Sequence, residues 1–164
     1  MIYSERMERL KRRALLANGD ILPDLVLTNG KVINVFNGKI IEGNIAIDNG
    51  KIIGIGNYEA KEKVDLNGAY VAPGLIDAHM HMESTMVTPD QMARIIVPRG
   101  TTTVVADPHE IANVLGLDGI QFMMNATENT VLNGFFMLPS CVPSTDFETS
   151  GAILDAKKLS TLFD

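Results

Sequence analysis

Two histidines separated by a single residue carry the clearest chemical signal in the sequence. His79 and His81 follow an apolar run over residues 71–78, which is typical of a strand buried on both faces in a parallel sheet. Because residues i and i+2 of an extended backbone point to the same side, both imidazoles would project together from the strand end. Two imidazoles placed in this way can bind one divalent metal ion. The alternative is a pair of surface histidines in a loop.

Carboxylates flank the histidine pair with the same spacing. Asp77 precedes His79 by two residues and Glu83 follows His81 by two residues, so all four side chains would share one face of an extended backbone. Carboxylates beside imidazole ligands can orient them or add to them. The spacing therefore predicts a metal site with acidic neighbours at the end of the strand.

The third histidine stands between two acids. Asp107, His109 and Glu110 fall within four residues, just after a second predicted strand. This group could transfer protons, contact a substrate or form an accessory metal site. The alternative is that Asp107 caps the helix that follows. Cys141 has no histidine nearby in sequence, and we expect it to be a small buried hydrophobic residue.

These side chains need elements that hold them, and the second half of the chain predicts alternating strands and helices. A helix begins at Thr88, where a capping-box pattern is followed by proline at the first helical position. The further predicted elements are a strand over 101–106, a helix from about 111 to 125 and a strand over 135–138. This alternation indicates successive βαβ units of a parallel sheet.

The stretch from residue 24 to residue 71 has a different pattern. It contains four Asn-Gly pairs, which begin at positions 29, 37, 49 and 67, and Asn-Gly is the strongest short-range signal for a β-hairpin. Short β-rich runs lie between the pairs, over residues 24–28, 31–35, 44–47 and 51–55. They predict a small, mostly antiparallel sheet, and no residue in it has a catalytic pattern.

Residues 1–20 predict a helix with a basic bias. Ser4 can serve as its N-cap, and the Asn-Gly pair at 18–19 can end it. The basic run over residues 11–13 could form a membrane or nucleic-acid patch. We interpret it instead as a solvated helix face, because helices often carry Lys and Arg toward their carboxyl ends.

Composition and length exclude several classes of protein. The formal net charge of −6 over 164 residues argues against a uniformly basic nucleic-acid surface. No apolar run reaches the roughly 18 residues of a membrane span, and the first residues lack a signal-peptide pattern. The single cysteine excludes an internal disulfide and fits a cytoplasmic location. A complete (β/α)8 barrel takes about 200–250 residues or more, so the length excludes a complete barrel that carries a second domain.

The histidine-bearing segment resembles a known family. Residues 71–81, VAPGLIDAHMH, resemble the first-strand signature of the amidohydrolase superfamily. Residues 83–86, 99–116 and 136–143 are similar to the bacterial and archaeal adenine deaminases of that superfamily. Together these segments and the hairpin-rich stretch extend the resemblance over nearly the whole chain.

The resemblance implies a fold. It implies an α/β chain with a metal-dependent (β/α)8 amidohydrolase barrel, of which the first three βα units are present, preceded by a small β-sandwich-like domain. The domains would be an amino-terminal helix over 1–20, the small β domain over 21–72 and the first part of the barrel over 73–164. Family members are several times longer, so we expect the chain to be an amino-terminal portion that is inactive alone.

The resemblance also implies an activity. It implies hydrolysis of adenine to hypoxanthine and ammonia in purine salvage, by water activated on a divalent metal centre with two ions of manganese, iron or zinc. The full-length enzyme would be a homo-oligomer without nucleic-acid or membrane partners. The implied metal ligands are His79 and His81. Glu83 would protonate a ring nitrogen, and the further catalytic candidates are Asp107, His109 and Glu110.

Two alternatives to this activity remain. Another amidohydrolase, which acts on a cyclic amide as dihydroorotases and hydantoinases do, would share the histidine pair. A non-catalytic fragment could instead act as a binding or assembly module, because three barrel strands leave edges that must pair with something. Activity toward adenine, compared with dihydroorotate and hydantoin, distinguishes these possibilities.

Overall fold

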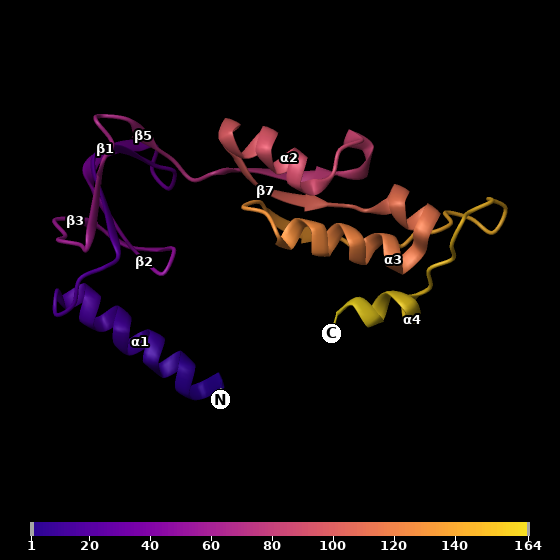
Figure 1. Ribbon diagram of the computed structural model, residues 1–164, viewed down its shortest axis with the longest axis horizontal. Helices are drawn as coiled ribbons and strands as arrows, with labels where there is room; N and C mark the ends of the chain where they lie inside the picture. Colours follow the sequence, from indigo (N-terminus) through magenta and orange to yellow (C-terminus); the bar gives the residue numbers. More distant parts are fainter. Residues whose placement is uncertain (1, 164) are drawn as a thin grey trace. The chain divides into compact units, whose positions relative to one another are not determined.

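The computed structural model describes residues 2–163, which divide into two compact units, Met1–Pro73 and Gly74–Asp164. Figure 1 shows the elements of both units, and each unit is described here by itself. Met1 and Asp164, which belong to the predicted segments 1–20 and 73–164, lie outside the described residues. No helix among the described residues is both long enough and apolar enough to cross a membrane.

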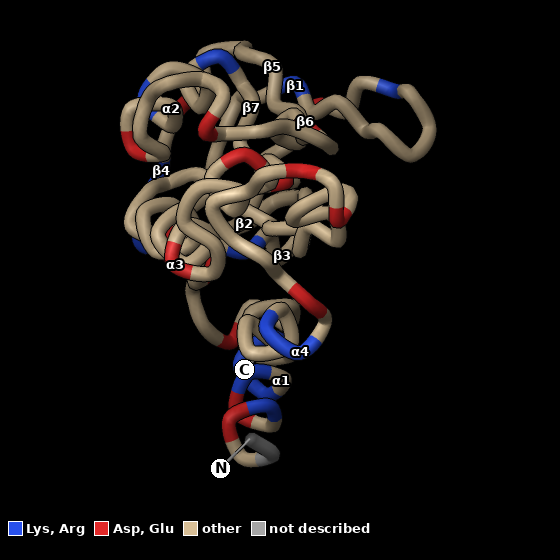
Figure 2. The backbone as a smooth tube through the Cα atoms, turned by 90° about the vertical axis from the view of Figure 1, so that its right-hand side faces the viewer, with Lys and Arg blue, Asp and Glu red and all other residues tan. Residues whose placement is uncertain are grey.

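The first unit opens with a helix, as predicted. Helix α1 spans Ile2–Asn18 and ends at Gly19, which adopts a positive φ of 79°. The prediction of Ser4 as N-cap is wrong, because the helix begins at Ile2 and Ser4 lies inside its first turn. Figure 2 shows both acidic and basic positions along α1, and Leu16 is its fully buried apolar side chain, 1% exposed.

One five-stranded sheet makes up the rest of the first unit. Its strands are β1 (Leu25–Asn34), β2 (Lys39–Asp48), β3 (Lys51–Gly56), β4 (Glu62–Asp65) and β5 (Tyr70–Val71). Strand β1 pairs antiparallel with β2 and parallel with both β4 and β5, and β2 pairs antiparallel with β3. The sheet is therefore mixed, and the two short parallel strands were not predicted. Residues 2–73 contain this single sheet and no second layer of a sandwich.

The Asn-Gly pairs have three different roles. Those at 37–38 and 49–50 form the hairpin turns between β1, β2 and β3, as predicted. The prediction is wrong at 29–30, where Asn29 has a φ of 55° inside the single strand β1 at a register shift. A left-handed residue can make a β-bulge as well as a turn, so the two predicted runs are one bent strand. The pair at 67–68 connects β4 to β5, which both run parallel to β1.

The second unit has the predicted βαβ order. Its parallel sheet has the order β6-β7-β8, and Figure 1 shows α2 and α3 beside β7. The elements are β6 (Leu75–Met80), η1 (Glu83–Thr85), α2 (Pro89–Ile96), η2 (Val97–Arg99), β7 (Thr101–Ala106), α3 (His109–Glu128), β8 (Asn133–Phe136), α4 (Ala156–Leu159) and η3 (Ser160–Leu162). Thr88 occupies the N-cap of α2 but its side chain does not cap the backbone, contrary to the capping-box prediction.

The core of this unit lies between the sheet and its two long helices. Its buried members are Met82, Met92, Ala93, Val104, Ala106, Met123 and Leu132. The prediction that residues 71–78 form a strand buried on both faces is wrong for the described chain. Leu75 and Ile76 are each 63% exposed, because β6 is an edge strand and no element among residues 74–163 covers its second face.

Candidate active site

The carboxyl ends of β6 and β7 bring the predicted site residues together. His79 lies in β6 and His81 directly follows it, while Asp107 directly follows β7. Met80 pairs with Ala106 in the parallel ladder, and the N–H of Asp107 donates to the carbonyl of Met80 at 2.8 Å. The two strand ends are therefore side by side, and the side chains that leave them meet at one edge of the sheet.

A first group of candidate metal ligands joins the two strand ends. His79, His81 and Asp107 each offer one ligand atom, and these atoms lie within 4.8 Å of one another. The two imidazole rings are 5.2 Å apart between centroids and nearly perpendicular, at 83°. Two neutral imidazoles and a carboxylate are a usual donor set for a divalent transition metal.

A second group shares His81 with the first. The ligand atoms of His81, Glu83 and Glu110 also lie within 4.8 Å of one another. Glu83 does not continue the extended backbone, because β6 ends at Met80 and Glu83 begins a 3-10 turn. The turn still directs its carboxylate to the site, where Oε1 accepts the backbone N–H of Ile111 at 3.1 Å.

Three buried polar atoms at this edge have no hydrogen-bond partner. They are His81 Nδ1, Glu83 Oε2 and Asp107 Oδ1, and they are the full set of such atoms among the described side chains of residues 4–163. Nδ1 of His81 lies 2.8 Å from Glu110 Oε2, but without hydrogen-bond geometry. Buried polar atoms in folded proteins are nearly always paired. Divalent cations held by the two ligand groups, which share His81, would give these atoms partners, so the residues fit a divalent metal.

The two glutamates at the site have opposite shifts in acidity. Burial raises the pKa of the Glu83 carboxyl above its ordinary value, and the neighbouring Glu110 carboxylate adds to that shift. Burial opposes ionisation of Glu110 as well, but a hydrogen bond from Ser84 Oγ at 2.8 Å and the nearby His81 outweigh it and lower the pKa of Glu110. Adjacent carboxyls with divergent pKa values are the usual arrangement for one acid and one base.

His109 lies in the first turn of α3 beside this cluster. Its ring centroid is 6.4 Å from that of His81, and its Nε2 lies 3.2 Å from the carbonyl oxygen of Cys141. Cys141 is half-buried, and its backbone, not its thiol, meets the histidine. The alternative that Asp107 caps α3 is wrong, because Pro108 holds the N-cap position and no side chain caps the helix there.

Sequence reasoning missed two polar residues that support the site. Ser84 hydrogen-bonds to Glu110, and Asn113 Nδ2 lies 3.2 Å from His109 Nε2. The spacing of Asn113, four residues after His109 in a predicted helix, was the available signal, since such pairs are neighbours on a helix surface. Ser84 had no comparable signal, because a 3-10 turn brings it near Glu110.

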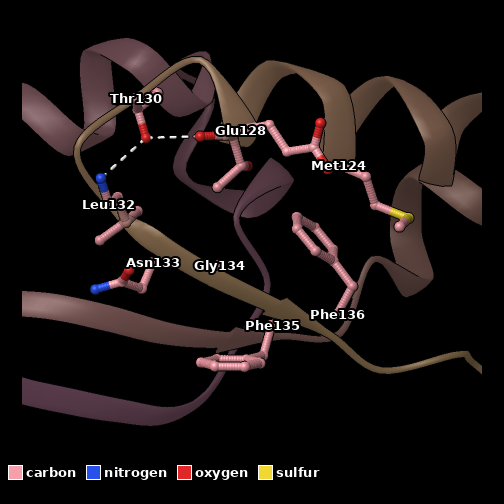
Figure 3. Close-up of a pocket in the computed structure, with 9 residues that line it drawn as sticks. Met124, Glu128, Thr130, Leu132, Asn133, Gly134, Phe135 and Phe136 are labelled. Carbon is pink, nitrogen blue, oxygen red and sulfur yellow. Dashed lines mark hydrogen bonds between the residues drawn. The ribbon is translucent and has the colours of Figure 1, made fainter. Parts of the chain in front are cut away.

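A pocket of the second unit lies apart from these residues. The end of α3 and strand β8 line it (Figure 3), and its residues are Met124, Thr127, Glu128, Thr130, Leu132, Asn133, Gly134, Phe135 and Phe136. Thr130 Oγ1 donates to the carbonyl of Thr127 at 2.8 Å and accepts the N–H of Leu132 at 3.1 Å. The lining contains one carboxylate and no histidine, so this pocket has no group of candidate ligands.

The fold and the site together define the class of protein. Residues 70–164 match the Amidohydrolase family, and the chain belongs to that family. Its β6-β7-β8 sheet and the helices on it are part of an amidohydrolase α/β barrel. D-hydantoinase (dihydropyrimidinase) from a Thermus species has a similar fold, with a TM-score of 0.52 and 23% identity over 68% of this chain and 26% of that chain. That similarity bears on the fold alone.

Curated relatives of higher identity are adenine deaminases. The adenine deaminase of Clostridium acetobutylicum is 57% identical over 140 residues, which are 85% of this chain and 25% of the relative. That of Listeria monocytogenes is 51% identical over 160 residues, 97% of this chain and 28% of the relative. The chain therefore spans about a quarter of the length of the curated relatives that it matches. Family membership and the two ligand groups support a divalent metal at the site.

Proposed function

We propose that the chain forms the amino-terminal part of a metal-dependent adenine deaminase, which hydrolyses adenine to hypoxanthine and ammonia. One observation carries this proposal: the three histidines and three acids gather at the carboxyl edge of β6 and β7, in a chain 51–57% identical to the adenine deaminases compared above. Barrel enzymes hold their active sites at that edge. The reaction serves purine salvage in the cytoplasm.

His79 and His81 hold the metal in this proposal. Their ring centroids lie 5.2 Å apart in an edge-to-face arrangement, and the unpaired Nδ1 of His81 provides a buried nitrogen donor. A pair of ions, for which manganese, iron and zinc are candidates, would bind His79 and His81 together with ligands from the rest of the full-length protein. A bound divalent cation supplies water of lowered pKa as the nucleophile.

The acids of the site move the protons in this proposal. Deamination needs one proton on a purine ring nitrogen and one on the departing amine. Glu83 holds a proton more tightly than an ordinary carboxyl, so it donates to the ring nitrogen, while ionised Glu110 is available as an acceptor. Asp107 and His109 lie at the same edge, where they serve proton transfer to the leaving amine and contacts with the purine.

The rest of the full-length protein completes the fold in this proposal. Further strands close the (β/α)8 barrel and supply the remaining ligands, because a catalytic metal usually needs three protein ligands and water. The five-stranded sheet, within the small domain over 21–72, forms one layer of a β-sandwich-like domain between the helix over 1–20 and the barrel segment over 73–164. The assembled enzyme is a homo-oligomer.

The test uses the full-length protein with manganese added. We expect the conversion of adenine to hypoxanthine, followed by absorbance, to exceed any turnover of dihydroorotate or hydantoin by several orders of magnitude. Turnover of a cyclic amide without turnover of adenine would replace the proposal by the other amidohydrolase activity. A metal-loaded, folded protein inactive on all three substrates would favour a binding or assembly module.

A further inference from the structure

The helix that carries His109 is interrupted two turns later. Gly116 has φ 61° and ψ −137°, which breaks the helical path inside α3. The residues over 109–115 therefore form a short helical segment with its own supports. Because the helix is broken at Gly116, this segment must be held in place by contacts with other parts of the chain.

A returning segment of the chain supplies those contacts. Residues 141–154, here called the clasp, are closed by an antiparallel bridge between Val142 and Leu154. The N–H of Gly151 donates to the carbonyl of Asn113 at 2.8 Å, and a Cβ on Gly151 would lie 2.8 Å from that same carbonyl oxygen. Only glycine allows so close an approach, so the clasp fits directly against the helical segment.

Asn113 connects the clasp to His109. Its Oδ1 lies 3.1 Å from Ser150 Oγ, which donates to it, and its Nδ2 donates to the carbonyl of His109 at 3.1 Å. The same Nδ2 lies 3.2 Å from Nε2 of the His109 ring. Because the carbonyl oxygen of His109 can only accept a hydrogen bond, it fixes the amide nitrogen on the side that faces the imidazole.

The clasp touches His109 at a second point. The carbonyl oxygen of Cys141, the first residue of the clasp, lies 3.2 Å from the same Nε2. Both polar neighbours of Nε2 thus depend on the clasp, one directly and one through Asn113. Within the described chain these contacts fall on Nε2, and no hydrogen bond engages Nδ1 of the same ring.

We propose that Asn113, held by Ser150 and Gly151, is a positioning residue that sets the orientation of the His109 ring. This inference rests on the proposed deaminase function, in which His109 acts at the reacting edge. The amide itself does not touch the substrate. Its effect reaches the reaction through the imidazole, in the way that supports of functional histidines generally do.

The test compares variants of the full-length enzyme loaded with manganese. Asn113→Ala and Ser150→Ala should each lower kcat for adenine by about 10- to 100-fold, with KM within threefold of wild type and metal content unchanged. Ser150→Thr, which keeps the hydroxyl, should recover most of the lost kcat. Asn125→Ala, an exposed asparagine of the same helix α3, is the matched control and should leave kcat unchanged.

A double variant separates positioning from general support of the fold. In the background of His109→Ala, the further change Asn113→Ala should add less than about twofold, because the two residues act as one unit. Additive losses, or a parallel loss of metal and thermal stability in both single variants, would overturn the inference. Full activity of Asn113→Ala and Ser150→Ala in an active wild-type background would also overturn it. An inactive wild type would instead reject the deaminase function on which the inference rests.

Discussion

His81 belongs to both groups of candidate ligand atoms, whereas His79 belongs to one. We predict that His81→Ala removes bound metal and adenine turnover together, and that His79→Ala does the same through loss of the first group. Metal analysis of the purified full-length variants, alongside the absorbance assay, measures both quantities. Arg94→Ala on the exposed surface of α2 is the control. Normal metal content with full turnover in both histidine variants would contradict the ligand assignment.

Glu83 differs from the histidines because burial keeps its carboxyl protonated to a higher pH. Glu83→Gln retains the shape of the side chain but cannot release a proton. We expect turnover to fall by about 10²- to 10⁴-fold with metal content near that of wild type. Glu128→Gln, an exposed carboxylate at the end of α3, should change neither quantity. Loss of metal in proportion to loss of activity would make Glu83 a ligand instead of a proton donor.

At the scale of elements, one half-buried ion pair attaches α1 to its sheet. Nε and one terminal nitrogen of Arg12 donate to the two carboxylate oxygens of Asp48 at 2.8 and 2.7 Å, and Asp48 is 4% exposed. Bidentate pairs of this kind are among the stronger side-chain contacts. The basic run over residues 11–13 thus includes an arginine that ties the helix to β2 rather than facing a nucleic acid.

We predict that Asp48→Asn loosens α1 without unfolding the second unit. The free energy that holds α1 on the sheet should fall by about 1–3 kcal/mol, because the asparagine offers Arg12 only one oxygen acceptor and no charge. Hydrogen exchange measured by mass spectrometry should become faster across residues 2–18 and stay unchanged across β7. Asp20→Asn, an exposed aspartate beyond the helix end, is the control. Unchanged exchange in α1 would show that other contacts dock the helix.

The same pair gives α1 docking a defined pH dependence. The hydrogen bonds from Arg12 lower the pKa of Asp48 below its ordinary value of 3.8. The pair therefore stabilises the folded state fully above that ordinary value and is lost as the pH falls through the lower folded pKa. Relative to the intrinsic exchange rate at each pH, exchange in α1 should become faster below about pH 4 in the wild type, while Asp48→Asn should show no such change. If exchange in α1 changed equally in Asp48→Asn, the pH dependence would come from other carboxyl groups.

The elements could be predicted from the sequence wherever a local pattern decides the structure. Strand β7 was predicted with its exact bounds, because a β-branched run stands between Gly100 and a proline-containing segment. The short parallel strands β4 and β5 could not be predicted from the sequence. Strand β4 has four exposed residues and β5 has only two, so neither shows a clear periodicity, and both depend on pairing with β1. The bulge at Asn29 has the same local sequence as a turn, and only the register of β2 distinguishes the two.

Within the candidate site, spacing along the chain predicted which residues are involved better than how they are arranged. The i and i+2 histidines do approach each other, but Glu83 arrives through a 3-10 turn instead of an extended strand. The hydrogen bonds of Asn113 with residue 150 and its neighbour span 37 and 38 positions. Such contacts depend on the path of the returning clasp, which no local pattern encodes.

At the scale of the whole molecule, residues 1–164 contain only part of a catalytic centre. His79, His81 and Asp107 offer one group of ligand atoms, but three strands do not close the barrel that would surround it, and β6 leaves an unpaired sheet edge. We predict that residues 1–164, expressed alone and given manganese, do not deaminate adenine. Hypoxanthine formation is measured beside the full-length enzyme at equal concentration. Turnover within a hundredfold of full length would show that the missing strands are dispensable.

The exposed edge strand β6 also has a consequence for synthesis on the ribosome. In a closed barrel the first strand pairs with the last, and this chain spans only about a quarter of the length of the adenine deaminases that it matches. At about 5–20 residues per second, a nascent chain of the relatives' length would carry this open edge, with Leu75 and Ile76 exposed, for tens of seconds. A chaperone that shields apolar strands should therefore bind the emerging polypeptide at β6 and leave it only when translation ends.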